Sequence, residues 1–381
     1  MPVNLFNLAS KTIKSLGTLF LLVTIYSYPA VASSSLAYDF SSVRLQKCWE
    51  SKDSEFFTRQ ITADTNFVFA ASSSEIRAID VDLGRQYWTA ELGGAIVSNL
   101  VPNNGSLFLV TAPIVKDTER PPFALLRSLS RQTGLPNWSV PIPPASRAYL
   151  GFLTGSVIVA SEDGTFAAYS SADGTQLWKL SVGGALSFAP VFNGTSLLAA
   201  TDKRRITAIS GEGKVLWAFS SEGAITAVTL FSDHAIALGS DRGNILRVSD
   251  EGESEWNFRL GGQTSLLEKT NRGIISASYD NFLYMLSGGG RLVWKRRLPA
   301  RITNSAIINE NFGVFAVANE GRLYLIDLKA GRILDQADLG EGNSELFVSA
   351  IPNRTAAAAA TGDIIRYYAA GSCVEREKRQ P

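Results

Sequence analysis

The segment AYSSADGTQLW, residues 168–178, is the clearest copy of a sequence motif that recurs along the whole chain, which we call the phrase. Its glycine and tryptophan stand four residues apart, and the same spacing returns at regular intervals. Successive glycines of the phrase are 50, 40, 39, 39, 38 and 41 residues apart. Such a period predicts a repeat architecture. The pairs are Gly84/Trp88, Gly134/Trp138, Gly174/Trp178, Gly213/Trp217, Gly252/Trp256, Gly290/Trp294 and the degenerate Gly331/Asp335.

Each repeat unit contains four short apolar segments and shows no helical periodicity. In one unit we expect strands at 186–192, 196–200 and 206–209 and a last strand around Trp217, separated by turns rich in Asn, Asp and Gly. Four short strands per unit predict one blade of a β-propeller. We interpret the tryptophan as a ring that covers the gap to the adjacent blade, and the glycine as a turn residue with positive φ. Ligand stacking by the tryptophans is the alternative.

The two ends of the chain complete one further blade. Residues 44–49 have the pattern of an outer strand without its blade, and Trp49 lies 39 residues before Trp88. Residues 347–369 supply inner strands, but no tryptophan strand follows them. We therefore predict an all-β, eight-bladed propeller of four-stranded antiparallel blades, with the last blade closed by the N-terminal strand. Closure of this kind leaves few exposed sheet edges.

The only two cysteines, Cys48 and Cys373, lie near opposite ends of the chain. When the repeats are aligned on their glycines and tryptophans, the two cysteines fall two positions apart in the composite blade. We predict a disulfide that locks the ring. The alternative is a pair of free thiols.

The first 32 residues have the features of a secretory signal peptide. Two lysines precede an apolar run at 16–26, and Ala30-Val31-Ala32 forms a small-x-small cleavage pattern, which predicts cleavage after Ala32. The apolar run is shorter than the roughly 20 residues that a transmembrane helix needs. A retained anchor is the alternative. We expect residues 33–373 to form a single propeller domain and 374–381 a disordered charged tail.

The charge balance excludes one class of partner. The chain has 36 Lys and Arg against 35 Asp and Glu, and the predicted leader removes two of the lysines. A nearly neutral mature chain lacks the excess of cations that phosphate binding requires, so we expect no nucleic-acid partner.

Two loop features are candidate contact sites. Blade 2 carries ten extra residues, 113–122, between its second and third strands. We treat the charged side chains there as a candidate partner loop. The alternative is tolerated sequence drift in a loop without a function. The turns between second and third strands also carry carboxylates that could form a ring around a cation or a basic partner. Turn formation is the favoured explanation for them, and nearby arginines dilute their charge. The loop residues are Lys116, Asp117, Glu119 and Arg120; the carboxylates are Glu162, Asp163, Asp202, Asp241, Asp280, Glu320 and Asp363.

The pattern Ala-x-Asp-x-x-x-Gly-x-x-x-Trp at residues 78–88 closely resembles the repeat of pyrroloquinoline quinone (PQQ)-like β-propellers. The resemblance covers nearly all of the mature chain. Two branches of the family concern us: quinoprotein dehydrogenases, and BamB-like scaffold subunits of the outer-membrane β-barrel assembly machinery. Eight blades and no extra domain resemble the BamB-like branch more closely.

The resemblance to the enzyme branch fails at the residues that carry its chemistry. Quinoprotein alcohol dehydrogenases have adjacent cysteines over the quinone, and this chain has none. Related sugar dehydrogenases use a histidine base, whereas the only histidine, His234, lies in a turn between two strands. We therefore expect no catalytic residue, no cofactor and no metal.

The resemblance to the scaffold branch implies a protein partner on one face of a monomeric propeller. BamB-like proteins are typically acylated on a cysteine after the signal, but here Ala32 is followed by three serines, so a periplasmic or secreted protein is expected. The connections that would hold partner contacts, 182–185 and 221–224, are short, and no contact residue is carried over. The leading hypothesis is a non-catalytic exported scaffold in envelope assembly. The alternatives are a PQQ-type quinoprotein and a small-ligand or carbohydrate-binding propeller.

Overall fold

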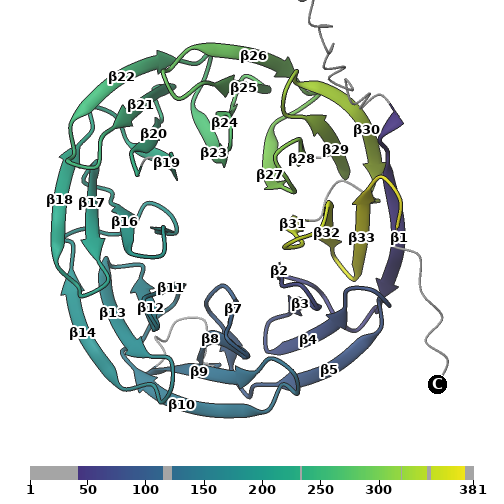
Figure 1. Ribbon diagram of the computed structural model, residues 1–381. Coiled ribbons are helices and arrows are strands. Elements are labelled where there is room, and N and C mark those ends of the chain that lie inside the picture. The colour runs from purple at the N-terminus through teal and green to yellow at the C-terminus, as the bar shows by residue number, and fades with distance from the viewer. Residues whose placement is uncertain (1–41, 115–121, 232–233, 319, 341–344, 374–381) are drawn as a thin grey trace, which may run out of the picture. The chain divides into compact units, whose positions relative to one another are not determined.

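A computed structural model describes residues 42–114, 122–231, 234–318, 320–340 and 345–373. Their strands form eight antiparallel sheets that follow one another around a ring, as the blades of a propeller (Figure 1). The predicted eight-bladed fold is therefore confirmed. Three predictions lie outside the described residues and stay predictions. They are the signal peptide with cleavage after Ala32, the candidate partner loop with Lys116, Asp117, Glu119 and Arg120, and the disordered tail at 374–381.

Seven blades are built from consecutive strands, ordered from the centre of the ring outward. We number them 1 to 7 along the chain. Blade 1 is β2 (Gln60–Ala63), β3 (Phe67–Ala71), β4 (Glu75–Asp80) and β5 (Gln86–Glu91). In blade 2 the inner strand is divided into β6 (Ala95–Ile96) and β7 (Val101–Asn103), followed by β8 (Ser106–Ala112), β9 (Ala124–Ser130) and β10 (Pro136–Ile142). Blade 3 is β11 (Ala148–Leu153), β12 (Ser156–Ser161), β13 (Thr165–Ser170) and β14 (Gln176–Ser181).

Blades 4 to 7 repeat this order. Blade 4 is β15 (Val191–Phe192), β16 (Ser196–Ala200), β17 (Arg205–Ser210) and β18 (Val215–Ser220). Blade 5 is β19 (Ile225–Leu230), β20 (Ile236–Ser240), β21 (Asn244–Val248) and β22 (Ser254–Arg259). Blade 6 is β23 (Thr264–Thr270), β24 (Gly273–Ser278), β25 (Phe282–Leu286) and β26 (Leu292–Arg297). Blade 7 is β27 (Ile302–Ile307), β28 (Phe312–Val317), β29 (Arg322–Asp327) and β30 (Arg332–Asp338).

The eighth blade is assembled from both ends of the chain. Its inner strands are β31 (Leu346–Ala350), β32 (Ala356–Thr361) and β33 (Ile364–Ala370), and its outer strand is β1 (Leu45–Lys52). In Figure 1 the purple β1 lies beside the yellow β33. We call this sheet the composite blade. It confirms the prediction that the N-terminal strand closes the ring.

One inner strand is shorter than the sequence predicts. The expected strand at 186–192 is reduced to β15, Val191–Phe192, with an isolated bridge from Leu186 to Thr201. Pro190 lies between these two pieces and has no backbone N–H to donate to the ladder. The larger apolar side chains of this segment are half-buried and pack against the neighbouring core clusters without continuous strand pairing.

The hydrophobic core is divided among the joints between blades. Eight clusters of buried side chains are found, and each combines residues from two neighbouring blades. The second strands are buried along their length, as in β3, whereas outer strands such as β14 alternate between exposed and half-buried side chains. Burial between sheets explains why each repeat depends on its neighbours for stability.

Every outer strand carries a β-bulge at the residue before the tryptophan position. In blade 3, Ala168 pairs with Trp178 while Tyr169 pairs with Gln176, so Leu177 is left outside the ladder. The equivalent residue in the composite blade is Cys48, between the paired Lys47 and Trp49. A bulge turns the side chain of the extra residue out of the regular pleat.

Candidate functional site

The recurring tryptophans make contacts between blades rather than within them. The ring of each tryptophan packs against the phrase glycine of the following blade, so that Trp178 of blade 3 meets Gly213 of blade 4. The composite blade joins the series because Trp49 meets Gly84 of blade 1. We call each of these contacts a Trp–Gly joint. They are Trp49/Gly84, Trp88/Gly134, Trp138/Gly174, Trp178/Gly213, Trp217/Gly252, Trp256/Gly290 and Trp294/Gly331.

Glycine is required at these joints for two reasons. Gly174 has a φ of 76°, and all seven phrase glycines have positive φ, a conformation that costs an L side chain free energy. A Cβ atom on Gly213 would also lie 2.6 Å from a ring carbon of Trp178. The sequence predicted the positive φ but not the aromatic ring against the glycine, because that ring belongs to the preceding repeat.

Hydrogen bonds fix the tryptophan rings in these joints. The indole N–H of Trp178 donates to the carbonyl oxygen of Gly211 at 2.8 Å, and that of Trp49 donates to Val81 at 2.7 Å. Equivalent bonds are made by Trp88, Trp138, Trp256 and Trp294. A buried indole N–H without a partner would cost free energy, so the ring both fills the gap and satisfies its donor.

The joint between blade 7 and the composite blade is built differently. Asp335 stands four residues after Gly331, at the tryptophan position, and Leu45 stands four residues before Trp49, at the glycine position. The backbone N–H of Leu45 donates to Oδ2 of Asp335 at 2.8 Å. The side chain of Leu45 packs in the cluster that also contains Leu334. At this joint an acidic residue, smaller than tryptophan, faces an apolar residue that is larger than glycine. We call it the closing joint.

A disulfide secures the composite blade. Cys48 and Cys373 are bonded, with their Cα atoms 5.6 Å apart and 325 residues between them in sequence. The bond links the bulge of β1 to the segment that follows β33, and the backbone N–H of Cys373 also donates to the side chain of Gln46 at 3.2 Å. The predicted pairing of the two cysteines is confirmed.

The carboxylates between second and third strands form turns. Asp163 accepts a backbone hydrogen bond from Thr165 at 2.9 Å. Asp202, Asp241 and Asp280 lie against glycines of the connections that enter their own blades, as Asp241 does against Gly223. No group of three or more His, Cys, Asp or Glu side chains among the described residues is placed to hold a metal ion.

Asp280 also has a partner of its own. The hydroxyl of Tyr284 donates to Oδ2 of Asp280 at 2.5 Å. Burial and this hydrogen bond raise the pKa of Tyr284 to about 12, so the phenol stays neutral. On the inner strand of the same blade, burial raises the pKa of Glu268, whose carboxylate accepts a hydrogen bond from Ser305 at 2.8 Å. Both groups are held in contacts between strands or blades.

The only histidine lies in a turn, as predicted. His234 is exposed between β19 and β20 and has a φ of 67°. Asn104 and Asn353 have positive φ at equivalent turns between first and second strands, which fits the turn-forming role of such Asn residues.

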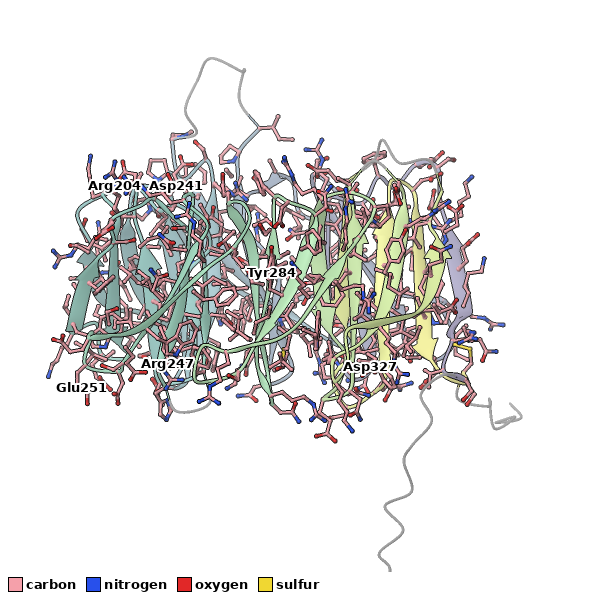
Figure 2. All side chains as sticks on the ribbon, turned by 90° about the horizontal axis from the view of Figure 1, so that it is seen from above. Arg204, Asp241, Arg247, Glu251, Tyr284 and Asp327 are labelled. Carbon is pink, nitrogen blue, oxygen red and sulfur yellow. A yellow bond between two sulfur atoms is a disulfide. The ribbon has the colours of Figure 1, made fainter. Side chains whose placement is uncertain are left out.

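The propeller presents two faces, seen from the side in Figure 2. Arg204 and Asp241 lie on the face formed by turns between second and third strands, and Arg247 and Glu251 lie toward the opposite face. The second face carries the turns between third and fourth strands, which contain the glycines of the Trp–Gly joints.

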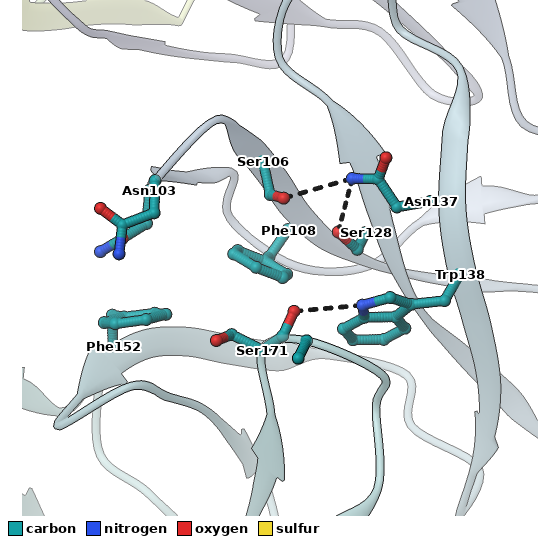
Figure 3. Close-up of a pocket in the computed structure, with 10 residues that line it drawn as sticks. Asn103, Ser106, Phe108, Ser128, Asn137, Trp138, Phe152 and Ser171 are labelled. Atoms are coloured by element: carbon teal, nitrogen blue, oxygen red, sulfur yellow. Dashed lines mark hydrogen bonds between the residues drawn. The ribbon is translucent and has the colours of Figure 1, made fainter.

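A pocket of about 320 Å³ opens on this second face between blades 2 and 3 (Figure 3). We call it the blade 2/3 pocket. The amide nitrogen of Asn137 donates to the hydroxyls of Ser106 and Ser128, at 3.2 and 3.1 Å. Beside this network lie the rings of Phe108, Trp138 and Phe152. The pocket is lined by Asn103, Asn104, Ser106, Phe108, Ser128, Asn137, Trp138, Phe152, Ser171 and Ala172.

The sequence did not single out this pocket. Its residues come from β7, β8, β9, β10 and β11 and from two turns, so no short motif contains them. The one available signal was a departure from the repeat, because Asn137 and Ser128 replace the apolar residues that most blades carry at these positions.

These observations define a closed eight-bladed propeller whose repeats are joined by tryptophan–glycine contacts. The family model described as outer membrane protein assembly factor BamB matches residues 122–257 and 205–377. The chain belongs to this family. None of the curated proteins searched matches the chain.

Solved structures of low sequence identity share the fold. The crystal structure of BamB from Moraxella catarrhalis has a TM-score of 0.65 at 17% identity and covers 88% of this chain and 99% of that one. The computationally designed Ika8 protein has a TM-score of 0.70 at 16% identity, with coverages of 85% and 99%. The C-terminal WD40 domain of Sif2 has a TM-score of 0.72 at 13% identity, with coverages of 86% and 99%. At these identities the likeness concerns the fold alone.

The described residues contain no helix long and apolar enough to cross a membrane.

Proposed function

We propose that this protein is a non-catalytic, exported scaffold that holds a protein partner on one face of the propeller during envelope assembly. The observation that carries the proposal is membership in the BamB-described family, whose model matches most of the propeller. The rigid construction of the ring supports it, because interlocked blades and a disulfide keep a binding face in one geometry. A periplasmic or secreted location follows from the predicted signal peptide, and an oxidising compartment suits the disulfide.

The test is crosslinking at defined positions on each face. A photoreactive amino acid is placed at Asp241 on one face or at Glu251 on the other, both of which are exposed. Native envelope fractions are irradiated and the adducts are identified by mass spectrometry. We expect adducts with components of the barrel-assembly machinery from one position only. Their absence from both positions, with the protein folded and exported, would contradict the proposal.

The absence of catalysis is tested by ligand-dependent stability. Both cysteines are joined in the disulfide, and His234 lies in an exposed turn. A quinoprotein with a functional site would gain stability from its ligands by mass action. We expect no change in Tm when calcium or PQQ is added to the purified protein. A rise with either ligand would favour the enzyme alternative.

A further inference from the structure

The blade 2/3 pocket differs chemically from the corresponding region of the other blades. The strand register identifies the equivalents of Ser128 and Asn137 in every blade. In six blades both positions are aliphatic, aromatic or, at Cys48, part of the disulfide, and neither carries an amide, an aliphatic hydroxyl or a charge. The pairs, in chain order from blade 1, are Ala78/Tyr87, Ala168/Leu177, Ala208/Leu216, Met285/Val293, Leu325/Leu334 and Tyr367/Cys48.

The remaining blade fills this space with its own charges. In blade 5 the equivalent residues are Arg247 and Glu255, which form an ion pair. The guanidinium of Arg247 also lies 4.5 Å from the ring centre of Phe231 and donates to the carbonyl oxygen of Gly288. Only blade 2 therefore combines neutral polar side chains at both positions with an open pocket among the joints that the structure describes.

The polar groups of the blade 2/3 pocket have hydrogen-bonding capacity left for a ligand. Asn137 uses its amide hydrogens on Ser106 and Ser128, and its side-chain oxygen, without a partner among the described residues, stays free to accept. The half-buried Ser106 keeps its own O–H to donate, whereas Ser128 is fully buried and orients the amide. The side-chain amides of Asn103 and Asn104 at the mouth of the pocket have no hydrogen-bond partner within the described chain. Each amide offers both a donor and an acceptor.

The other wall of the pocket is aromatic. The ring of Phe108 lies 6.2 Å from that of Phe152 and 6.0 Å from that of Trp138, centre to centre. Figure 3 shows Phe152 and Trp138 at either end of the pocket with Phe108 between them. Phe152 is partly exposed, so part of its ring is available to a ligand.

We propose that the blade 2/3 pocket binds a neutral sugar, as a monosaccharide or the end unit of a longer glycan. A pyranose has an apolar C–H face that packs on aromatic rings and hydroxyls that pair with amides and serines. None of the ten lining side chains carries a charge, which disfavours ionic ligands. A volume of about 320 Å³ is within the range of small-ligand pockets. The proposal does not depend on a protein partner for the propeller.

The test uses three neutral disaccharides as probes: maltose, cellobiose and N,N′-diacetylchitobiose. Each is titrated into the full-length protein and followed by saturation-transfer NMR and calorimetry, up to about 10 mM, where a contact worth a few kcal/mol is still detected. A capped dipeptide, N-acetyl-Phe-Ser-amide, is measured in parallel. We expect at least one disaccharide to bind and the dipeptide not to bind.

Variants locate the binding. The double variant Ser128→Ala/Asn137→Leu copies the Ala168/Leu177 pair of blade 3, which folds with these residues. We expect an unchanged Tm and at least about a tenfold rise in Kd, because the exposed amide of Asn137 is lost together with the hydrogen bond that orients Ser106. Phe152→Leu keeps an apolar side chain of somewhat smaller volume, removes the flat ring and should weaken binding similarly. The control is Leu216→Asn, which places an amide at the equivalent position of blade 4 and should leave Kd unchanged.

Three results would overturn the proposal. The first is that none of the three disaccharides binds. The second is that binding persists unchanged in both the double variant and Phe152→Leu. The third is that the capped dipeptide binds and is lost in these variants, which would assign the pocket to a peptide. None of these results bears on the crosslinking test of the scaffold function.

Discussion

The Trp–Gly joints and the closing joint solve the same packing problem with opposite choices of residue size. At a Trp–Gly joint a large ring from one blade covers a residue without a side chain in the next. At the closing joint the large residue is replaced by Asp335 and the glycine by Leu45, so the two changes compensate in volume. The difference shows that each joint is specified by a pair of residues in neighbouring blades.

The reason for the exchange lies in chain connectivity. At the other joints the glycine belongs to a hairpin turn that needs positive φ, as at Gly213 with a φ of 79°. Leu45 begins β1, which is paired with β33 but is not joined to it by a hairpin. No positive φ is needed there, and an ordinary side chain is allowed.

Polar contacts of Arg366 hold the composite blade together and join it to blade 7. Across the joint, Arg366 of the composite blade donates to the carbonyl oxygen of Leu339 in blade 7 at 2.9 Å. Within the composite blade it donates to Glu50 of β1 at 3.0 Å. The disulfide between Cys48 and Cys373 then adds a covalent bond to the same blade. The one joint without a Trp–Gly contact among the described residues therefore adjoins the blade that carries the disulfide.

The largest effect is expected from removing a tryptophan. Trp178→Ala leaves a cavity against Gly213 and should lower the free energy of unfolding by about 3–5 kcal/mol. Asp335→Ala, its equivalent at the closing joint, removes one hydrogen bond and should cost about 1 kcal/mol. Urea denaturation of both variants measures the difference. Equal losses would show that the two kinds of joint do not differ in energy.

The next effect concerns the covalent bond. Cys48→Ser should lower the free energy of unfolding by about 2–4 kcal/mol, because the open chain gains conformational entropy when unfolded. Reducing agent should destabilise the natural protein by a similar amount and leave the Cys48→Ser/Cys373→Ser variant unchanged. Thermal unfolding with and without reductant checks this. If complete reduction leaves the stability of the natural protein unchanged, the disulfide does not stabilise the closed ring.

An exchange of residues tests the pairing rule directly. Asp335→Trp alone places a large ring against Leu45 and should cost about 1–3 kcal/mol through overpacking. Adding Leu45→Gly supplies the partner found at the other joints and should recover part of that loss. A double-mutant cycle by urea denaturation gives the coupling energy. If the effects of the two substitutions are strictly additive, positions 45 and 335 are not energetically coupled, which would contradict the pairing rule.

The smallest effect is a pH dependence confined to the composite blade. Hydrogen bonds from Lys47 and Arg366 hold the pKa of Glu50 below its ordinary value. Its contribution to stability is therefore present above the unfolded-state pKa and is lost as pH falls through the lower folded-state pKa. Solvent screening limits the effect, so Glu50→Gln should cost about 0.5 kcal/mol at pH 7.

The measurement for Glu50 is the free energy of unfolding between pH 7 and pH 3. The variant and the natural protein should converge at the acidic end. Lys329→Gln serves as the control, because it changes a charge in blade 7 away from these partners and should shift stability little at either pH. A gap that stays constant with pH would show that the carboxylate charge is not responsible.

The sequence predicted the parts of the fold that repeat. The spacing of Gly174 and Trp178, copied along the chain, was enough to predict the number of blades, the composite blade and the pairing of Cys48 with Cys373. It was less informative about single strands, since Pro190 interrupts a segment whose apolarity suggested a continuous strand. It also did not reveal the blade 2/3 pocket, where the signal was only a polar departure at Asn137.

The periodic placement of small turn residues and large rings determined the architecture by itself, because such a period is consistent with few structures and fixes which residues are equivalent. Only the tertiary structure showed that the ring of Trp178 packs against Gly213 of the next blade rather than against Gly174 of its own repeat. It likewise showed that Leu45 and Asp335 form one compensated pair. These contacts join residues of different repeats, and they exist only after the sheets have packed side by side.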